Sequence, residues 1–546
     1  MKQLISYLVW LGGAVLVPLQ LFAQTDRQPS RADSLLYRDY AFLKQSDPWL
    51  TSPNAAGLQR LTVGHLSQAT LSLQYDKGYF TNYYGAPKAL TAAAGVESFY
   101  RLSPDIVIFG KIAYRNEALK NLTGSAFVNP TRMPFDIVEN SLTNAGDKHL
   151  DTYQLTGAVS GRVYKKVSLG VKVDFTAANY AKYKDLRHKN NLMNLVVTAG
   201  LYVPVANWLT VGAHYEYLRH TESVVFKKYG ASDQVYKSLV SYGAFIGKVE
   251  TFGAYGYTDM NQEMPFFDEH QGGGIQLDFQ LAPQLSWYHA FSFNRRKGYY
   301  GKKSPYTISY NQHESNGYQY QTRLTWKQRQ NLHQWDFAIE TEKLQDFANT
   351  YREMTDEETS AHYYAYYSPV KLSDKLWTTG QVAYSGRFGL KNQVPVWAVQ
   401  AGMNFMFRRQ TAYEYPYFRR QEIRSYEEWV QAEYNLFLPK GILTVGAGFA
   451  YRNGRGSLCE DGTFAEPSAK QSFPPEMEAF LHREYQYLTA PRYQVDGSVK
   501  YGFIFPNTRM KTFAKINISH QKAHCNDVLM EGNDRLSGTL TIGCEF

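Results

Sequence analysis

Tight turns and longer connections alternate along the chain, and this asymmetry constrains the fold more than any other feature. Outer-membrane barrels have short periplasmic turns and long extracellular loops. Soluble sandwiches and propellers have no reason for such a two-sided pattern. We therefore predict an all-β fold, a transmembrane antiparallel up-and-down β-barrel, with tight turns at 102–105, 164–167, 205–208, 281–284, 438–441 and 505–508 and less sharp turns near Asn331 and Ser373.

These turns also predict the number of strands. They divide the chain into about 18 strands with both ends in the periplasm, and the even-number rule for bacterial barrels leaves 16 to 20 open. One segment, "VWAVQAGMNFMFRR", has the pattern of a strand although this division places it inside a connection. The long connections are predicted at 117–150, 181–191, 227–269, 299–316, 346–359, 391–426, 453–483 and 522–534.

The individual strands alternate as a barrel wall requires. In "VSLGVKVDFTA", Val167, Val171 and Val173 belong to one face, and Lys172 and Asp174 belong to the other. A basic side chain facing lipid at the bilayer midplane costs about 2–4 kcal/mol, so the polar row is predicted to face the lumen.

The hydropathy of the mature chain argues against membrane-spanning helices and leaves a β-barrel as the way in which it could span a membrane. After residue 23 no apolar run approaches the roughly 20 residues of a membrane helix. Without such a helix, only a closed barrel satisfies the backbone in lipid. The 44 tyrosines suit this setting, because an apolar ring with a polar tip fits half-buried sheet surfaces and membrane interfaces.

The N-terminal region reads differently from the barrel. Residues 1–23 have the charged start, apolar run and small-residue cleavage site of a secretory signal peptide, and the alternative is an uncleaved membrane anchor. In 24–58, Leu35, Leu36, Tyr40 and Leu43 have helical spacing before a turn-rich stretch. We expect this segment to fold into or under the barrel as a plug, with the barrel itself formed by 59–546.

The last strand ends the chain without a polar tail. Leu536, Leu540, Ile542 and Phe546 fall on one face of the alternation and are predicted to face lipid. This ending resembles the C-terminal signal of outer-membrane proteins that the barrel-assembly machinery reads. We therefore assign Leu540, Ile542 and Phe546 to an assembly signal.

Four stretches resemble an uncharacterised outer-membrane barrel family of Bacteroidota. They are "SDPWLTSPNAAGL", "YAKYKDLRHKNN", "YGYTDMNQEMPFF" and the terminal "TIGCEF". The element "NAAGL" is also similar to the Asn-Pro-Ala-Gly-Leu start of fatty-acid-transporter-like barrels, with Ala55 in place of the Pro. The resemblance implies the fold and a bacterial outer-membrane location, and it implies no activity.

Motifs for chemistry are absent from the sequence. It contains no His-Glu-x-x-His, Gly-x-Ser-x-Gly, P-loop or Cys-x-x-Cys pattern and nothing typical of nucleic-acid binding. We therefore predict no enzyme activity, no cofactor, no metal and no nucleic-acid partner.

Two basic clusters are candidate binding sites for an anionic ligand or lipid A. The alternative for each is a structural one: a solvated loop for the first, and an aromatic interface belt with loop packing for the second. Phosphates attract cations, and guanidinium groups beside aromatic rings suit sugars and acidic ligands. The first comprises Lys182, Lys184, Arg187, His188 and Lys189, and the second comprises Arg408, Arg409, Tyr413, Tyr415, Tyr417, Arg419, Arg420 and Arg424.

The three cysteines allow at most one internal disulfide. Cys459 and Cys525 fall in successive predicted extracellular loops, whereas Cys544 falls on the final strand. An exported protein meets no cytosolic reductant. We predict a Cys459–Cys525 pair, and three unpaired thiols are the alternative.

Two functions stay open from the sequence. The first is a passive channel or transporter for a solute, because a barrel of about 18 strands encloses a lumen too wide for side chains to fill. The second is a non-transporting barrel whose long loops bind a surface lipoprotein, a secretion component or a TonB-dependent uptake partner. Outer-membrane lipids, lipopolysaccharide and the barrel-assembly machinery are expected partners of either.

Overall fold

The computed structural model describes residues 39–546 except 140–144, 232, 254–255, 259–262, 505–509 and 526–529. The predicted signal peptide and the first part of the predicted N-terminal helix lie outside these residues. No helix in the described part of the chain combines the length and apolar character of a membrane span.

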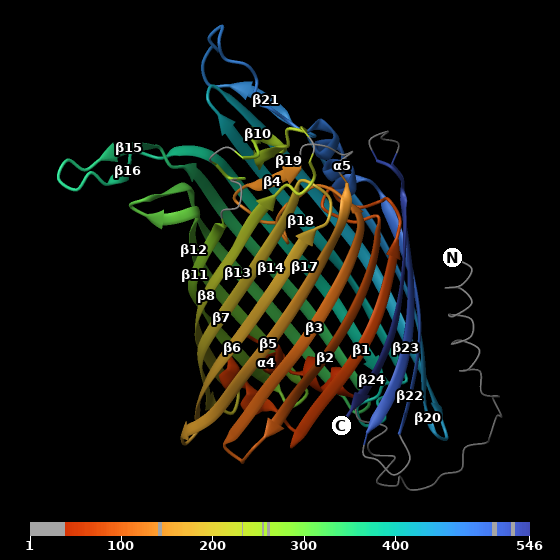
Figure 1. The fold of residues 1–546 in the computed structure, drawn as a ribbon. Coiled ribbons are helices and arrows are strands. Elements are labelled where there is room, and N and C mark those ends of the chain that lie inside the picture. Colours follow the sequence, from red (N-terminus) through yellow and green to blue (C-terminus); the bar gives the residue numbers. More distant parts are fainter. Residues whose placement is uncertain are drawn as a thin grey trace.

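A closed antiparallel barrel of 18 strands forms the body of the molecule, as predicted (Figure 1). Each strand pairs with the next barrel strand along the chain, and the last pairs with the first. The strands are β1 His65–Lys77, β2 Lys88–Arg101, β3 Ile106–Leu122, β5 Gly146–Tyr164, β6 Val167–Lys182, β7 Arg187–Ala206, β8 Leu209–Lys227, β11 Met264–Ala282, β12 Leu285–Ser304, β13 Thr307–Gln328, β14 Asn331–Ala348, β17 Val370–Phe388, β18 Trp397–Glu414, β19 Tyr417–Leu438, β20 Gly441–Gly456, β22 Arg492–Ile504, β23 Lys511–Ala523 and β24 Asp534–Glu545.

The remaining elements lie at the two ends of the barrel. We call the end with the two-residue connections such as 165–166 the turn end, and the opposite end the loop end. The helices α3 Tyr40–Ser46, α4 Pro48–Thr51 and η1 Ala55–Arg60 belong to the turn end. The loop end carries β4 Asp136–Glu139, β9 Lys237–Gly243, β10 Ile246–Thr251, β15 Tyr351–Thr355, β16 His362–Tyr366, β21 Glu460–Thr463 and α5 Glu478–Thr489.

Side chains alternate between lipid and lumen along the wall as predicted. On β6, Val171 and Val173 are exposed on the outer face, and Lys172 and Asp174 pair inside at 2.8 Å. Near the turn end the outer face carries exposed tryptophans, as expected for an aromatic girdle at a membrane interface. They are Trp208, Trp287, Trp326, Trp335 and Trp397.

The turn predicted near Ser373 is wrong. Ser373 and Lys375 lie within β17, and the real turn comes after Phe388 and before Trp397. Ser373 and Lys375 in "KLSDK" point into the lumen, where Lys375 donates to the backbone oxygens of a loop, and Asp374 between them takes the opposite face and accepts from Tyr413. The strand-like segment "VWAVQAGMNFMFRR" is accordingly a wall strand, β18.

Three of the predicted long connections are also wrong. The connections expected at 181–191, 299–316 and 391–426 are tight hairpins, joined by 183–186, 305–306 and 415–416. Strands β12, β13 and β19 reach 20 to 22 residues, well beyond the length needed to cross a membrane. The change in sequence pattern marks the point where a strand leaves the membrane. In these hairpins the hydrogen-bonded pairing of the two strands continues beyond that point.

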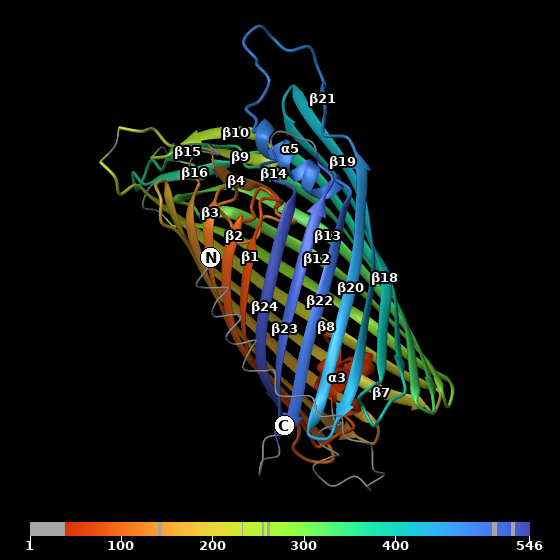
Figure 2. The same ribbon diagram turned by 90° about the vertical axis from the view of Figure 1, so that its right-hand side faces the viewer.

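Residues 39–60 pack inside the barrel at the turn end (Figure 2). Trp49 is buried and makes T-shaped contacts with the Tyr202 and Tyr288 rings, at 4.9 and 5.5 Å between ring centroids. Its indole Nε1 donates to Asp278 at 3.1 Å. Asn54 donates from Nδ2 to the Leu201 oxygen at 2.9 Å.

Three glycines of the wall make room for this segment. An added Cβ would lie 2.2 Å from the Ala56 nitrogen at Gly170, 2.0 Å from the Asn54 side chain at Gly200 and 2.7 Å from Trp49 at Gly212. The three occupy adjacent strands, β6, β7 and β8, on the inner face. The wall therefore has a fitted hollow for the N-terminal segment, which we call the glycine cradle.

The terminal residue completes the seam of the barrel. Phe546 exchanges two backbone hydrogen bonds with Ser67 on β1, at 3.0 and 3.1 Å, beyond the last residue of β24. We expect deletion of Phe546 to remove both bonds, at about 1 kcal/mol each, together with ring burial, and to lower the yield of folded barrel. The measurement is the fraction with heat-modifiable mobility in membrane extracts. Phe546→Leu, which keeps the backbone, is the control, and a wild-type yield from the deletion would contradict the expectation.

The glycine cradle yields a second prediction. Gly170→Val should expel the N-terminal segment, because its Cβ collides with backbone that cannot move aside. Limited proteolysis of the folded barrel should then cleave between residues 39 and 60, which the wild type protects. Gly161→Val is the matched control, since nothing lies within 4 Å of an added Cβ there. Equal protection in both variants would show that the cradle does not hold the segment.

Candidate solute path in the barrel lumen

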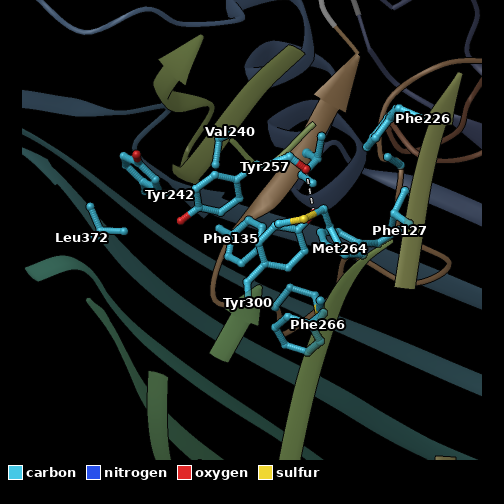
Figure 3. Packing of buried hydrophobic residues seen from close by; sticks show 14 of the residues in the cluster. Phe127, Phe135, Phe226, Val240, Tyr242, Tyr257, Met264, Phe266, Tyr300 and Leu372 are labelled. Atoms are coloured by element: carbon cyan, nitrogen blue, oxygen red, sulfur yellow. Dashed lines mark hydrogen bonds between the residues drawn. The ribbon is translucent and has the colours of Figure 1, made fainter. Parts of the chain in front are cut away.

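A cap folded from the long loops occupies the lumen at the loop end. Its sheet consists of β10, β9 and β4 in that order, and α5 packs beside it. The loop before β4 brings Phe127 and Phe135 against Phe266 and Tyr300 of the wall, and all four rings are buried (Figure 3). The Tyr300 hydroxyl donates to the backbone carbonyl oxygen of Tyr257 at 2.7 Å. The cap is therefore a packed body with an apolar core shared with the barrel.

Charged side chains of the wall hold the cap through its backbone. Lys375 donates from Nζ to the Met133 and Pro134 oxygens at 3.0 and 2.7 Å. On other strands, Arg296 donates to the Arg132 oxygen at 2.9 Å and Lys148 donates to the Ser125 oxygen at 2.9 Å. Hydrogen bonds from buried cations are stronger than neutral ones, so these three anchors fix the segment 125–134.

The anchor Arg296 is itself neutralised by a buried network. It pairs with Asp268 at 2.6 Å and with Glu342 at 3.2 Å. His313 contacts the same Asp268 at 2.6 Å. Because unpaired buried charges are costly, the network keeps the anchor charged within the wall. A second pair, Arg132 with Glu340, joins the cap to β14 directly.

Three adjoining cavities run along the inner face of β14, β17 and β18. A cavity of about 640 Å³ lies at mid-height, above Thr51 and Pro53 of the N-terminal segment. Towards the turn end it shares Gln321, Ala338 and Gln381 with a cavity of about 340 Å³. Towards the loop end it shares Thr379 and Met406 with a cavity of about 200 Å³ beneath the cap. Because neighbouring cavities share lining residues, the three form a row through the lumen, with constrictions between them.

The N-terminal segment contacts the wall on both sides of the lumen at the turn end. Its closest packing is with β5, β6 and β7, the wall that carries most of the glycine cradle. The cavities lie against β14, β17 and β18 instead. On the cavity side, Arg323 and Gln334 donate to the Gln45 and Ser46 backbone oxygens at 2.7 and 3.3 Å. The segment therefore narrows the lumen at the turn end and forms part of the cavity lining.

The path is lined mainly by neutral hydrogen-bonding groups. The middle cavity presents side-chain amides and hydroxyls, with Glu340, Glu427 and Arg452 as its charged residues. Amides both donate and accept, so they match hydroxyl and amide groups of a solute without requiring a charge. The amides are Gln276, Gln319, Gln321, Gln381 and Asn404.

No sequence motif selects these lining residues. Each lies on the inward face of its strand, and the alternation alone identifies that face. What the sequence could not show is which inward residues are left uncovered by the cap and the N-terminal segment. Lys375 was missed for a related reason, because its stretch resembled a turn.

The first basic cluster is divided by the wall. Lys182 and His188 are buried inside, where Lys182 pairs with Glu139 and His188 contacts Asn190 at 2.9 Å. Lys189 lies on the outer face. Arg187 pairs with Asp185 at 2.9 Å, and Lys184 donates to the Ala145 oxygen at 3.1 Å. The five residues therefore form no single surface.

The second basic cluster lies on the β18–β19 hairpin and is divided in the same way. Arg408 faces inward and pairs with Glu484 of α5 at 2.7 Å, and Arg419 pairs with Asp461 and Glu476 at 2.7 Å each. These two arginines hold the cap. The Tyr413 hydroxyl donates to Asp374 and the Tyr417 hydroxyl to the Gln471 oxygen. The outer face carries Arg409, Arg420 and Arg424, and Tyr415 is exposed in the turn between the two strands.

The structure does not contain the predicted Cys459–Cys525 bridge. All three cysteines lie in described segments, and no disulfide joins them. Cys459 packs against the cluster of Phe245 and Phe480, whereas Cys525 packs against the cluster of Phe80 and contacts Gln486 at 3.5 Å. Successive loops at the rim thus fold into different parts of the cap.

Among the described residues, no group of three or more His, Cys, Asp or Glu side chains is arranged to hold a metal ion.

Several solved structures are similar to this chain at very low identity. The ferric preacinetobactin receptor BauA of Acinetobacter baumannii is 8% identical, with a TM-score of 0.40, over 88% of this chain and 80% of that chain. The outer membrane transporter YddB of Escherichia coli is 7% identical, with a TM-score of 0.37, over 88% and 80%. The ferric-catecholate import receptor Fiu of E. coli K12 is 7% identical, with a TM-score of 0.38, over 88% and 81%.

Likenesses at these identities concern the fold alone, and the resemblance to fatty-acid-transporter-like barrels gains no support from them. No curated protein matches the chain significantly. A family match covers residues 55–546, which is the whole barrel and the end of the N-terminal segment. The chain belongs to the family described as "Family of unknown function (DUF6850)".

Proposed function

We propose that the protein is a barrel of the bacterial outer membrane that conducts an uncharged polar solute through its lumen. The observation that carries this proposal is the run of three adjoining cavities between the cap and the turn end. Their amide lining favours uncharged, hydroxyl-rich or amide-rich solutes, such as short neutral saccharides. The role is that of a channel or transporter without enzyme activity.

The outer surface supports the membrane assignment. Exposed aliphatic residues cover the middle of the outer face, including Leu71, Leu73, Val171 and Ile275, and tryptophans lie near the turn end. An exposed apolar surface of this extent is incompatible with solution and suited to lipid. The turn end then faces the periplasm, and the loop end faces outward.

A partner-binding barrel is the alternative function. A surface lipoprotein or a TonB-dependent uptake partner would then use the loop end, and the cavities would conduct nothing. Liposome swelling with purified protein separates the two functions. Swelling in neutral sugars that declines with sugar size supports conduction, and impermeability of both the wild type and the cap-release variant below would refute it.

Release of the cap should open the path. Lys375→Met removes both hydrogen bonds to the Met133 and Pro134 oxygens and leaves them buried and unsatisfied, a loss of about 1–3 kcal/mol per group. We expect single-channel conductance and swelling rate to rise above the wild type. Lys166→Gln, an exposed turn-end lysine, is the charge-matched control. Unchanged conductance with a folded barrel would show that the cap does not limit passage.

The cap also gives a pH prediction. Burial raises the pKa of the Asp136 carboxyl to about 6, although hydrogen bonds from Ser125 and Tyr83 lower it. The folded cap therefore favours the protonated acid, so this stabilisation is present below about pH 4 and is lost as the pH rises through about 6. We expect conductance to increase between those values. Asp136→Asn should flatten the increase, and Asp356→Asn, in an exposed loop, should keep it. An increase that survives in Asp136→Asn would exclude Asp136 as its cause.

A further inference from the structure

A groove on the outside of the barrel lies between the wall and the β15–β16 hairpin. The hairpin extends sideways from the loop end, next to the turn between β12 and β13 (Figure 1). Two hydrogen bonds fix it there, from the Tyr364 nitrogen to the Pro305 oxygen at 2.9 Å and from the Ser309 nitrogen to the Tyr366 hydroxyl at 2.8 Å. The groove has a volume of about 1060 Å³.

The groove belongs to the lipid side of the wall. Phe267 and Tyr299, which line it, alternate with the inward-facing Asp268 and Arg296 of the same strands. A few residues towards the turn end on the same outer face come exposed Phe291 and Phe293. The groove is therefore continuous with the apolar band and separate from the solute path.

Cations gather on the outer face at this level. Lys297 and Lys303 line the groove and are exposed, and Lys303 lies 5.8 Å from the centre of the Tyr299 ring. Three further cations, Arg219, Arg295 and Lys343, occupy the neighbouring outward positions of β8, β12 and β14.

Two carboxylates share this surface. Glu269 lies directly opposite Arg219 and Lys297 in the strand register, and Glu314 lies 3.3 Å from Arg295. Five cations against two carboxylates leave the surface around the groove positive. The protein surface is apolar below the groove and positive around it. It therefore complements a membrane lipid whose acyl chains lie below an anionic headgroup.

We infer that this groove binds the diphosphorylated sugar headgroup of an outer-leaflet glycolipid, lipid A. The phosphates would pair with Lys297 and Lys303, for which charge-assisted hydrogen bonds are the strong contacts available. The aromatic rings of Phe267, Tyr299 and Tyr366 would cover the sugar faces, and the acyl chains would continue onto the apolar band. The lipid enters from the membrane, so a soluble anion is not the occupant.

Native mass spectrometry of the full-length protein in detergent tests the site with lipid A as the probe. The double variant Lys297→Gln/Lys303→Gln should weaken binding of diphosphorylated lipid A at least tenfold. The double variant Lys165→Gln/Lys166→Gln makes the same charge change at the turn end and should bind as the wild type does. Heat-modifiable mobility verifies that both variants are folded.

Two further probes identify the contact. Monophosphorylated lipid A should bind the wild type more weakly than the diphosphorylated form, and this difference should shrink in the Lys297/Lys303 variant. Inorganic pyrophosphate should not displace the lipid at equal concentration. Lipid A that fails to bind the wild type, binds both double variants equally, or is displaced by pyrophosphate would overturn the inference. Conductance plays no part in this test, so it stands or fails apart from the proposed function.

Discussion

Closure of the hydrogen-bonded ladder is the constraint on which the rest of the structure depends. In lipid every backbone N–H and C=O must find a partner within the protein, and a sheet meets this demand only if it has no edge. Here the seam is formed by β1 and β24, and its pairing extends to the last residue, Phe546. Once the ladder is closed, its circumference fixes a lumen too wide for the wall side chains alone.

Segments of the chain fill most of that lumen, one from each end of the barrel. At the turn end, residues 39–60 occupy the glycine cradle, where glycines in the wall leave room for Trp49 and Asn54. At the loop end, the cap shares an apolar core with the wall and is held by buried cations. What is left between them is a path with a polar lining along β14, β17 and β18, to which both segments contribute residues. The candidate site is thus defined by what the plugging segments leave exposed.

The sequence predicted the wall much better than its contents. Alternation along strands such as β6 follows from a period of two, so it identifies the barrel and its inward rows, and the turns indicate about 18 strands. It failed near Ser373, because lumen-facing polar residues resemble a turn when their partners in the cap are unknown. It also grouped Lys182 and His188 with Lys184 and Lys189, although a strand sends neighbours to opposite faces. Contacts between the cap and the wall join residues far apart in sequence, and no local pattern records them.

The contact between the N-terminal segment and the last strand has a consequence for the order of assembly. The Tyr40 nitrogen donates to the Glu545 carboxylate of β24 at 3.3 Å, and Lys511 of β23 reaches the same carboxylate at 3.3 Å. The cradle lies on β6, β7 and β8, so it exists as soon as the first half of the sheet has formed. The contact of Tyr40 with Glu545 becomes available only once β24 is in place, so the segment completes its packing as the seam closes.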